Sequence, residues 1–99
     1  MKIRRSYHSN LKLVEYYIPG RKKIYHRLDG PALKFNDGEQ WYRYGKPHRD
    51  DGPAIIWHDS EEWWLNGILF TKEEWFEALP EDKKLKMLYS EYFIGSRNA

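Results

Sequence analysis

The sequence predicts an α+β fold, in which an antiparallel β-meander of about six strands is followed by two C-terminal helices. The phrase His-Arg-x-Asp-Gly-Pro-Ala occurs at 26–32 and again at 48–54, and aligning 26–47 with 48–69 gives ten identities. This fixed period of 22 residues indicates tandem structural repeats. From position 71 the sequence shows helix-start signals instead of the hairpin pattern, so the helices are predicted to follow the repeats along the chain.

The 99 residues are predicted to form a single domain, because a chain of this length supports one hydrophobic core. The domain is divided into a degenerate repeat at 1–25, two clear hairpin repeats at 26–47 and 48–70, and a helical segment at 71–94. The degenerate repeat is inferred from the likeness of Glu15–Gly20 to Gln40–Gly45. Terminal repeats are often atypical because they cap a stack.

The hairpin of the first clear repeat is predicted to turn at residues 37–38. Their sequence, Asp-Gly, is a strong signal for a two-residue turn whose central residues both have positive φ. This register pairs Asn36 with Glu39 and Lys34 with Trp41. A slip of one residue would exchange the two faces of the sheet, so the register decides which side chains share a face.

The second clear repeat has its equivalent turn at residues 59–60, where Ser replaces the turn glycine. In the same register each repeated Trp lies on one sheet face beside the small Ala of its own repeat. Trp41 is thus predicted to lie beside Ala32, and Trp63 beside Ala54. The small side chain leaves room for the indole.

The helical segment begins with a capping box formed by Thr71 and Glu74. Phe70 and Trp75 occupy the positions of a hydrophobic staple. This helix should end by Leu79, because the next residue is a proline.

A second helix is predicted to open at Pro80 and to end at Gly95. Its first turn is acidic, which suits a helix N-terminus. One apolar stripe follows the helical spacing and consists of Leu85, Leu88, Tyr89, Tyr92 and Phe93. This stripe is expected to pack on one face of the sheet.

The composition argues against several protein classes. The chain contains no Cys, so it forms no disulfide, as is typical of a reducing compartment. No stretch approaches the roughly 20 apolar residues of a membrane-spanning helix, and no apolar run follows the basic N-terminus as in a signal peptide. We therefore predict a cytoplasmic protein, in the host cytoplasm if a phage encodes it.

No catalytic, metal or cofactor site is predicted. The four histidines are His8, His26, His48 and His58, and no third ligand accompanies the repeat-equivalent pair His26 and His48. No Ser–His–acid set, phosphate loop or zinc signature is visible, so we predict a non-enzyme. The Asp of each phrase is expected to cap a turn and to pair with the His and Arg, which gives Arg27 and Arg49 structural roles.

Charge is unevenly distributed along the chain. Residues 1–49 carry twelve Lys/Arg and four Asp/Glu, whereas residues 50–99 carry five and eleven. Such asymmetry indicates a charged partner for one end, or two ends that differ only in their solvated faces. The residues predicted to bind a partner lie at the basic end: Arg4, Arg5, Tyr7, Arg21, Lys22 and Lys23. Basic residues interleaved with aromatics also suit phosphate contact and base stacking, so the alternative is a nucleic-acid-binding accessory protein.

The repeated His-Arg-x-Asp-Gly-Pro-Ala and Trp-x-x-x-Gly positions resemble MORN-type repeats of the variant class over 26–70. Asp-Gly-Pro-Ala stands where standard repeats have a His-Gly-x-Gly pattern, so lipid binding is not carried over. With Asn66-Gly67 followed by the Thr-x-Glu-Glu of 71–74, the chain looks like short phage and prophage proteins. The resemblance implies a small anti-CRISPR-like or antitoxin-like inhibitor, which binds and blocks a host protein such as a defence-system component or nuclease.

Overall fold

The computed structural model describes residues 4–8, 13–90 and 92–93, with the side chains of Arg4–His8 and Leu13 outside the description. Over these residues the chain forms ten strands and two helices, and the predicted α+β class is confirmed. The strands are β1 (Arg4–His8), β2 (Leu13–Ile18), β3 (Ile24–Tyr25), β4 (Leu33–Phe35), β5 (Gly38–Gln40), β6 (Tyr42–Arg43), β7 (Lys46–Pro47), β8 (Ile55–Trp57), β9 (Ser60–Leu65) and β10 (Ile68–Phe70). The helices are α1 (Lys72–Ala78) and α2 (Glu81–Leu88).

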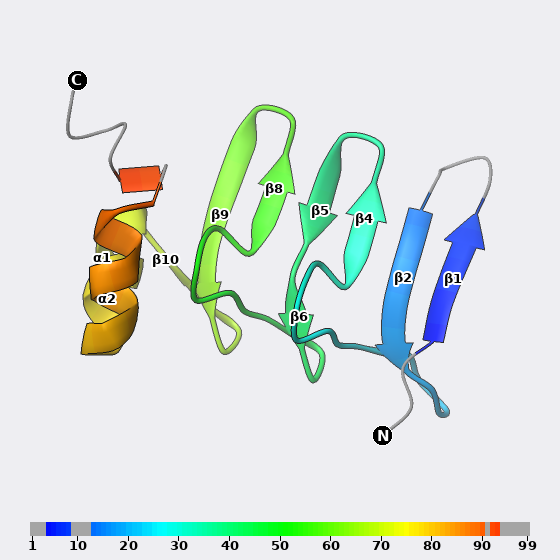
Figure 1. Cartoon of the computed structure of the whole chain (residues 1–99). Coiled ribbons are helices and arrows are strands. Elements are labelled where there is room, and N and C mark those ends of the chain that lie inside the picture. The colour runs from blue at the N-terminus through cyan, green and yellow to red at the C-terminus, as the bar shows by residue number, and fades with distance from the viewer. Residues whose placement is uncertain (1–3, 9–12, 91, 94–99) are drawn as a thin grey trace.

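The main sheet has the order β1-β2-β4-β5-β8-β9-β10, with β3 beside β2 and with β6 and β7 paired separately. All of these pairs are antiparallel. The hairpins stand side by side along a body of 43 × 27 × 19 Å, and both helices lie at its C-terminal end (Figure 1). No described helix is long and apolar enough to cross a membrane.

The strand number exceeds the predicted six because each clear repeat holds a second, shorter hairpin, which adds β6, β7 and β10, and because β3 pairs with β2. Tyr44 and Gly45 join β6 to β7 with φ of 48° and 80°, and Asn66 and Gly67 join β9 to β10 with φ of 50° and 81°. Positive φ at both central residues defines the type I′ turn that suits two-residue hairpins. Gly45 and Gly67 are therefore the second residues of two-residue turns that connect paired strands.

The predicted register of the first long hairpin is wrong by two positions. Lys34 pairs with Glu39 and Phe35 with Gly38, so the turn is formed by residues 36–37. The turn of the second long hairpin is likewise one residue earlier than predicted, at residues 58–59 instead of 59–60. Because the pairing is displaced by two residues, the alternation of side chains is unchanged and the predicted faces are kept.

Gly38 is required by the neighbouring strand and not by a turn, since it has no positive φ. It faces Trp57 of β8, and a Cβ placed on it would lie 2.4 Å from the Ile56 carbonyl oxygen. Ser60 holds the equivalent place in the last repeat. No described strand pairs with β9 on that side of Ser60, so a side chain is tolerated there.

The first helix follows its prediction closely. Thr71 Oγ1 accepts the Glu74 N–H at 3.1 Å while Glu74 Oε1 accepts the Thr71 N–H at 3.0 Å, which is the predicted capping box. The helix ends at Ala78. Its buried Trp75 packs with Trp63 of β9 in the core of the C-terminal end.

The predicted apolar stripe of the second helix is wrong. The helix ends at Leu88, so Tyr92 and Phe93 follow it and pack around the core as partly buried side chains. Leu85 and Tyr89 are exposed, and Met87 is the buried residue of α2. The early helix end moves the buried face away from the expected spacing.

Candidate functional site

The two histidines of the repeated phrase bind the short hairpins. His26 Nδ1 accepts the Tyr44 N–H, and His48 Nδ1 accepts the Asn66 N–H, each at 3.0 Å. An accepting Nδ1 carries no proton, so both rings are neutral with the proton on Nε2. The predicted pairing of each histidine with the Asp of its own phrase is therefore not made.

The surroundings of both imidazoles favour the neutral form. Burial lowers the pKa of His26 and of His48, and the nearby Arg43 guanidinium lowers both pKa values further. At His48 the carboxylate of Asp50 acts in the opposite direction. The His26 side chain is fully buried, and its Nε2 has no hydrogen-bond partner among the described residues.

Each arginine of the phrase closes its own loop. Arg49 Nε donates to Asp51 Oδ1 at 2.8 Å, and Arg49 Nη1 donates to the Pro53 carbonyl oxygen at 3.1 Å. A Cβ on Gly52 would lie 2.7 Å from Arg49 Cζ, so the loop needs glycine beneath the guanidinium. The first repeat makes the same contacts through Arg27, at 3.2 Å to Asp29 and 3.2 Å to Pro31.

The same guanidinium covers the aromatic residue of the preceding unit. Arg49 Cζ lies 3.9 Å from the centre of a Trp41 ring, and Arg27 Cζ lies 4.1 Å from that of Tyr16. Trp41 O accepts the His48 N–H at 3.0 Å, as Tyr16 O accepts the His26 N–H at 3.2 Å. Tyr16 thus takes the place of Trp41 in the first unit.

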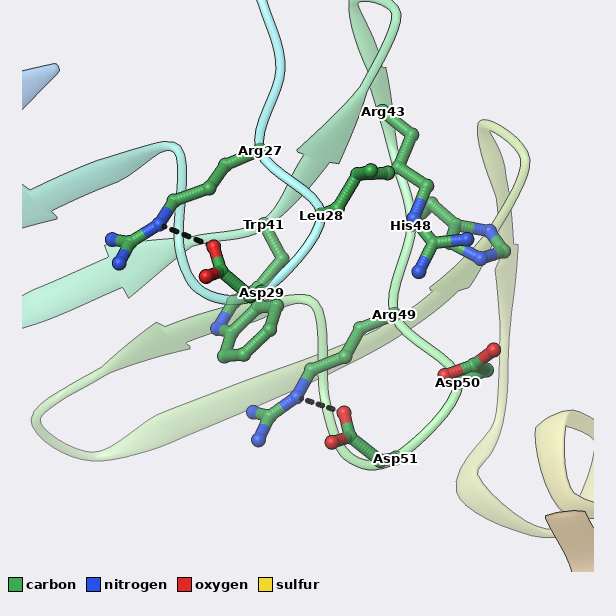
Figure 2. Close-up of a pocket in the computed structure, with 9 residues that line it drawn as sticks. All are labelled: Arg27, Leu28, Asp29, Trp41, Arg43, His48, Arg49, Asp50 and Asp51. Atoms are coloured by element: carbon green, nitrogen blue, oxygen red, sulfur yellow. Dashed lines mark hydrogen bonds and ion pairs between the residues drawn. The ribbon is translucent and has the colours of Figure 1, made fainter. Parts of the chain in front are cut away.

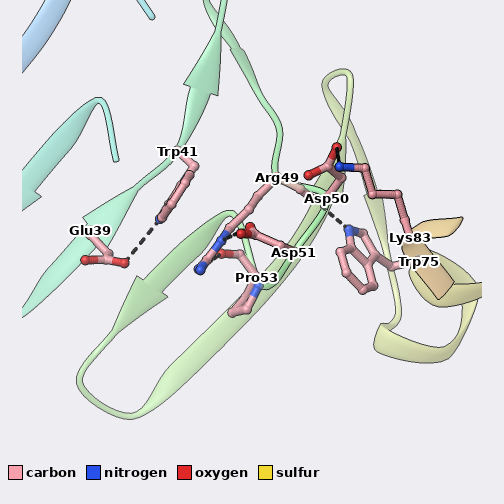
Figure 3. A network of polar contacts seen from close by, with 8 residues as sticks. All are labelled: Glu39, Trp41, Arg49, Asp50, Asp51, Pro53, Trp75 and Lys83. Carbon is pink, nitrogen blue, oxygen red and sulfur yellow. Dashed lines mark hydrogen bonds and ion pairs between the residues drawn. The ribbon is translucent and has the colours of Figure 1, made fainter. Parts of the chain in front are cut away.

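The helices attach to the second loop through polar contacts. Trp75 Nε1 donates to the Arg49 carbonyl oxygen at 2.9 Å, and Lys83 Nζ lies 3.5 Å from Asp50 Oδ2 (Figure 3). The repeated His, Arg, Asp and Gly of the phrase are therefore all engaged in contacts within the fold. In the described part of the chain, no three His, Cys, Asp or Glu side chains gather as a metal set.

A cavity of about 120 Å³ lies between the two repeated loops. Its wall includes Trp41, Arg43 and His48, together with the Arg and Asp side chains of both loops (Figure 2). Arg27 and Arg49 are held by their own loops, as described above. Arg43 comes from β6 and is half-buried.

The predicted binding residues of the N-terminal half fall into two groups. Arg4, Arg5 and Tyr7 lie on β1, where Arg4 pairs with Tyr17 and Arg5 with Tyr16 near the C-terminal end of β2. The side chains of these three residues are outside the description. The basic loop, residues 21–23, is exposed between β2 and β3.

Lys23 differs from the other two residues of the basic loop. Its Nζ donates at 3.1 Å to Glu15, a carboxylate that is only 3% exposed. The hydrogen bond from Lys23 to Glu15 raises the pKa of Lys23. Arg21 and Lys22 make no ion pair with another described residue, so they are the cations of this loop that the fold leaves available.

One exposed surface was not predicted. The hairpin row, which we define as residues 24–25, 44–47 and 66–69, is formed by β3 and the two short hairpins. Its members are joined by hydrogen bonds from Gly45 N to Tyr25 O at 2.8 Å and from Gly67 N to Pro47 O at 2.9 Å. In Figure 1 these segments lie along one long side of the molecule, at the lower ends of the strands in this view.

The hairpin row carries large exposed apolar side chains, which are Ile24, Tyr44, Ile68 and Leu69. Ile24, Lys46 and Ile68 are spaced by 22 residues and occupy equivalent places. Ile24 Cγ2 lies over Gly45, and the Lys46 side chain lies over Gly67. The period of the repeat was the sequence signal that could have revealed this row.

Comparison of the chain with protein-family models, with curated proteins and with solved structures finds no match. The MORN-type and phage resemblance therefore stays a prediction. The candidate site rests on the geometry of the loops, the cavity and the hairpin row.

Proposed function

We propose that this chain is a non-enzymatic protein-binding module that holds an acidic surface of its partner along the hairpin row and the basic loop. The resemblance of its phrase to variant MORN repeats favours a phage-type inhibitor that blocks a host defence-system component or nuclease. Its partner is then a host protein or protein complex in the cytoplasm.

The hairpin row is the observation that carries this proposal. Ile24, Tyr44 and Ile68 are 42%, 59% and 58% exposed, so much of their apolar surface is open to solvent, although one side of the Tyr44 ring packs against His26 with ring centres 4.2 Å apart. Arg21 and Lys22 directly precede one end of the row, and Lys46 lies within it. Exposed aromatic and apolar side chains rimmed by cations suit a protein interface, in which Tyr and Arg are common anchors.

The nucleic-acid alternative is less well supported, because the aromatic rings of the basic half are in use. Arg27 covers Tyr16, Arg49 covers Trp41, and Lys23 Nζ lies 5.1 Å from the centre of the Tyr17 ring. Tyr25 donates its hydroxyl to Glu15 at 3.0 Å. Base stacking needs open ring faces, and these rings offer few.

The test is capture of a bacterial protein from nuclease-treated lysate by the immobilised chain, followed by binding measurements with the captured protein. Tyr44→Asn places in the first repeat the residue that the second repeat has at the same turn position. It removes the exposed ring and keeps a residue that tolerates positive φ. We expect this variant to stay folded, with a lower melting temperature because the Tyr44 ring packs on His26, and to lose most of its affinity for the partner at a temperature where it is fully folded.

Charge is tested with a matched pair of variants. Lys22→Glu reverses a charge in the basic loop, and Lys86→Glu makes the same change on the exposed surface of α2. Lys22→Glu should slow association at low salt, because rim charges act mainly on the association rate, whereas Lys86→Glu should not. An association rate of Lys22→Glu equal to that of wild type, together with an unchanged affinity of Tyr44→Asn, would overturn the proposed surface. Recovery of nucleic acid from an untreated lysate, lost at high salt, would support the alternative.

A further inference from the structure

Arg43 departs from the pattern of the repeat. The equivalent position of the second repeat is Leu65, and the alignment of 15–20 with 40–45 gives Ile18 in the first unit. Arg43 pairs with Lys46 across β6 and β7 as Leu65 pairs with Ile68 across β9 and β10. The fold therefore accepts an aliphatic side chain at this position, and it does not require the guanidinium group of Arg43.

The charge of Arg43 is not compensated within the described structure. Its guanidinium makes no ion pair or hydrogen bond with another described residue. The three carboxylates of the cavity wall already have cations, because Asp29 pairs with Arg27, Asp51 with Arg49 and Asp50 with Lys83. A half-buried guanidinium without a directly paired counter-charge is unfavourable, so Arg43 lacks a carboxylate partner of its own in this cavity.

The cavity has the room and the position to accept that charge. Its volume of about 120 Å³ is ample for the four non-hydrogen atoms of a –CH₂–COO⁻ group. Arg43 lies next to His48 on one side of it, and Arg27 lies on the opposite side (Figure 2). Leu28, at the rim, is 63% exposed and offers an apolar contact to whatever enters.

We propose that Arg43 binds one carboxylate side chain of the protein partner in the cavity between the two repeated loops. This inference deepens the proposed function and rests on it for the source of the carboxylate. A planar guanidinium matches a carboxylate in a two-point contact. A dianionic phosphate suits the cavity less well, because three carboxylates already line it.

Binding has a consequence that can be observed at the histidines. The positive charge of Arg43 lowers the pKa of His26 and of His48. A bound carboxylate offsets that charge, so the pKa of both rings rises on binding. Asp50, which already raises the pKa of His48, stays in place and is paired with Lys83.

Sodium acetate is the probe, titrated into the isolated protein against sodium chloride at the same ionic strength. The matched variant is Arg43→Leu, which introduces the residue of the second repeat. For wild type we expect a saturable shift of the Arg43 Nε–H resonance and an upward shift of the His48 pKa. The shift of the His48 pKa should be lost in Arg43→Leu, whose melting temperature should equal or exceed that of wild type.

Three outcomes would overturn the proposal: no saturable shift of the Arg43 resonance with acetate in wild type, equal acetate-dependent shifts of the His48 pKa in wild type and Arg43→Leu, or tighter binding of inorganic phosphate than of acetate. This titration needs no partner, so its failure is separate from failure of the proposed function. Once the partner is captured, Arg43→Leu should weaken its binding at least tenfold. Unchanged binding would show that the carboxylate site is not part of the interface.

Discussion

The two clear repeats have the same loop but different neighbours. In repeat 26–47 the ring of Trp41 is covered by Arg49 of the next repeat. In repeat 48–70 no further repeat follows, and Trp63 is packed against Trp75, with Lys72 Nζ 5.5 Å from its ring centre. Each unit needs a cover for its aromatic residue. The helices supply for the last unit what a following loop supplies for the others.

The largest expected difference between the repeats concerns these two tryptophans. Trp63 is 5% exposed within the helix core, so Trp63→Ala should lower the free energy of unfolding by about 3–5 kcal/mol. Trp41 is only half-buried beneath Arg49, and Trp41→Ala should cost less. Urea unfolding of both variants measures the difference. Equal losses would contradict the account of the helices as the cover of the last repeat.

The next difference lies at the turn ends of the long hairpins. Gly38→Ser forces a side chain against the Ile56 carbonyl oxygen and should cost about 1–3 kcal/mol through overpacking. The reverse exchange, Ser60→Gly, meets no strand and should cost about 0.5–1 kcal/mol through backbone entropy alone. Thermal unfolding of the pair tests this, and similar losses for both would mean that the open side of Ser60 is occupied.

A smaller difference is expected between the two loop arginines. The Arg49 side chain is 12% exposed in its ion pair with Asp51, whereas that of Arg27 is 27% exposed. Lysine cannot reproduce the paired contacts to the carboxylate and the proline carbonyl. Arg49→Lys should therefore cost about 1–2 kcal/mol and Arg27→Lys less. A larger loss for Arg27→Lys in urea unfolding would reverse the ranking of the two loops.

Part of the pH dependence of stability should come from His26 and His48, of which each clear repeat contains one. His26 and His48 have pKa values lowered by folding, so the unfolded chain binds more protons than the folded chain as the solution becomes acidic. Their contribution to stability is complete above the unfolded pKa of about 6.5 and decreases as pH falls through that value. Urea midpoints should therefore drop from pH 7.5 toward pH 5.5.

The control is the double variant His26→Asn, His48→Asn. An Asn side chain keeps an acceptor near the position of Nδ1 but does not titrate in this range. We expect the double variant to have a lower free energy of unfolding than wild type at every pH, because Asn is smaller than the buried His26 and leaves part of its space empty. Its urea midpoint should depend less on pH than that of wild type. An equal pH dependence would exclude the two histidines as its source.

Much of the fold follows from local sequence patterns. The repeats followed from one phrase that recurs after 22 residues, and the start of the first helix followed from Thr71 and Glu74, which lie within one helical turn. The long-hairpin register could not be obtained in this way. Gly38 is set by β8, which comes from the next repeat, so its meaning is not local.

The candidate site was less predictable than the fold. The basic loop was expected to bind as a whole, but Lys23 is held by Glu15 of another strand. Residues 44–45 form a two-residue turn, but Tyr is uncommon at its first position, so the sequence does not indicate the turn. Asn66-Gly67 has the Asn-Gly sequence that usually indicates such a turn. The hairpin row became visible only when both turns were placed side by side.

The central claim is that the repeated phrase is a structural device in which each histidine holds the turn of a short hairpin. The most direct test is the ¹⁵N chemical shifts of the imidazole nitrogens of His26 and His48 near pH 7.5. The account predicts that both rings are neutral, with the proton on Nε2 and with Nδ1 as an acceptor. A proton on Nδ1 of either ring, or a charged imidazolium at that pH, would contradict it.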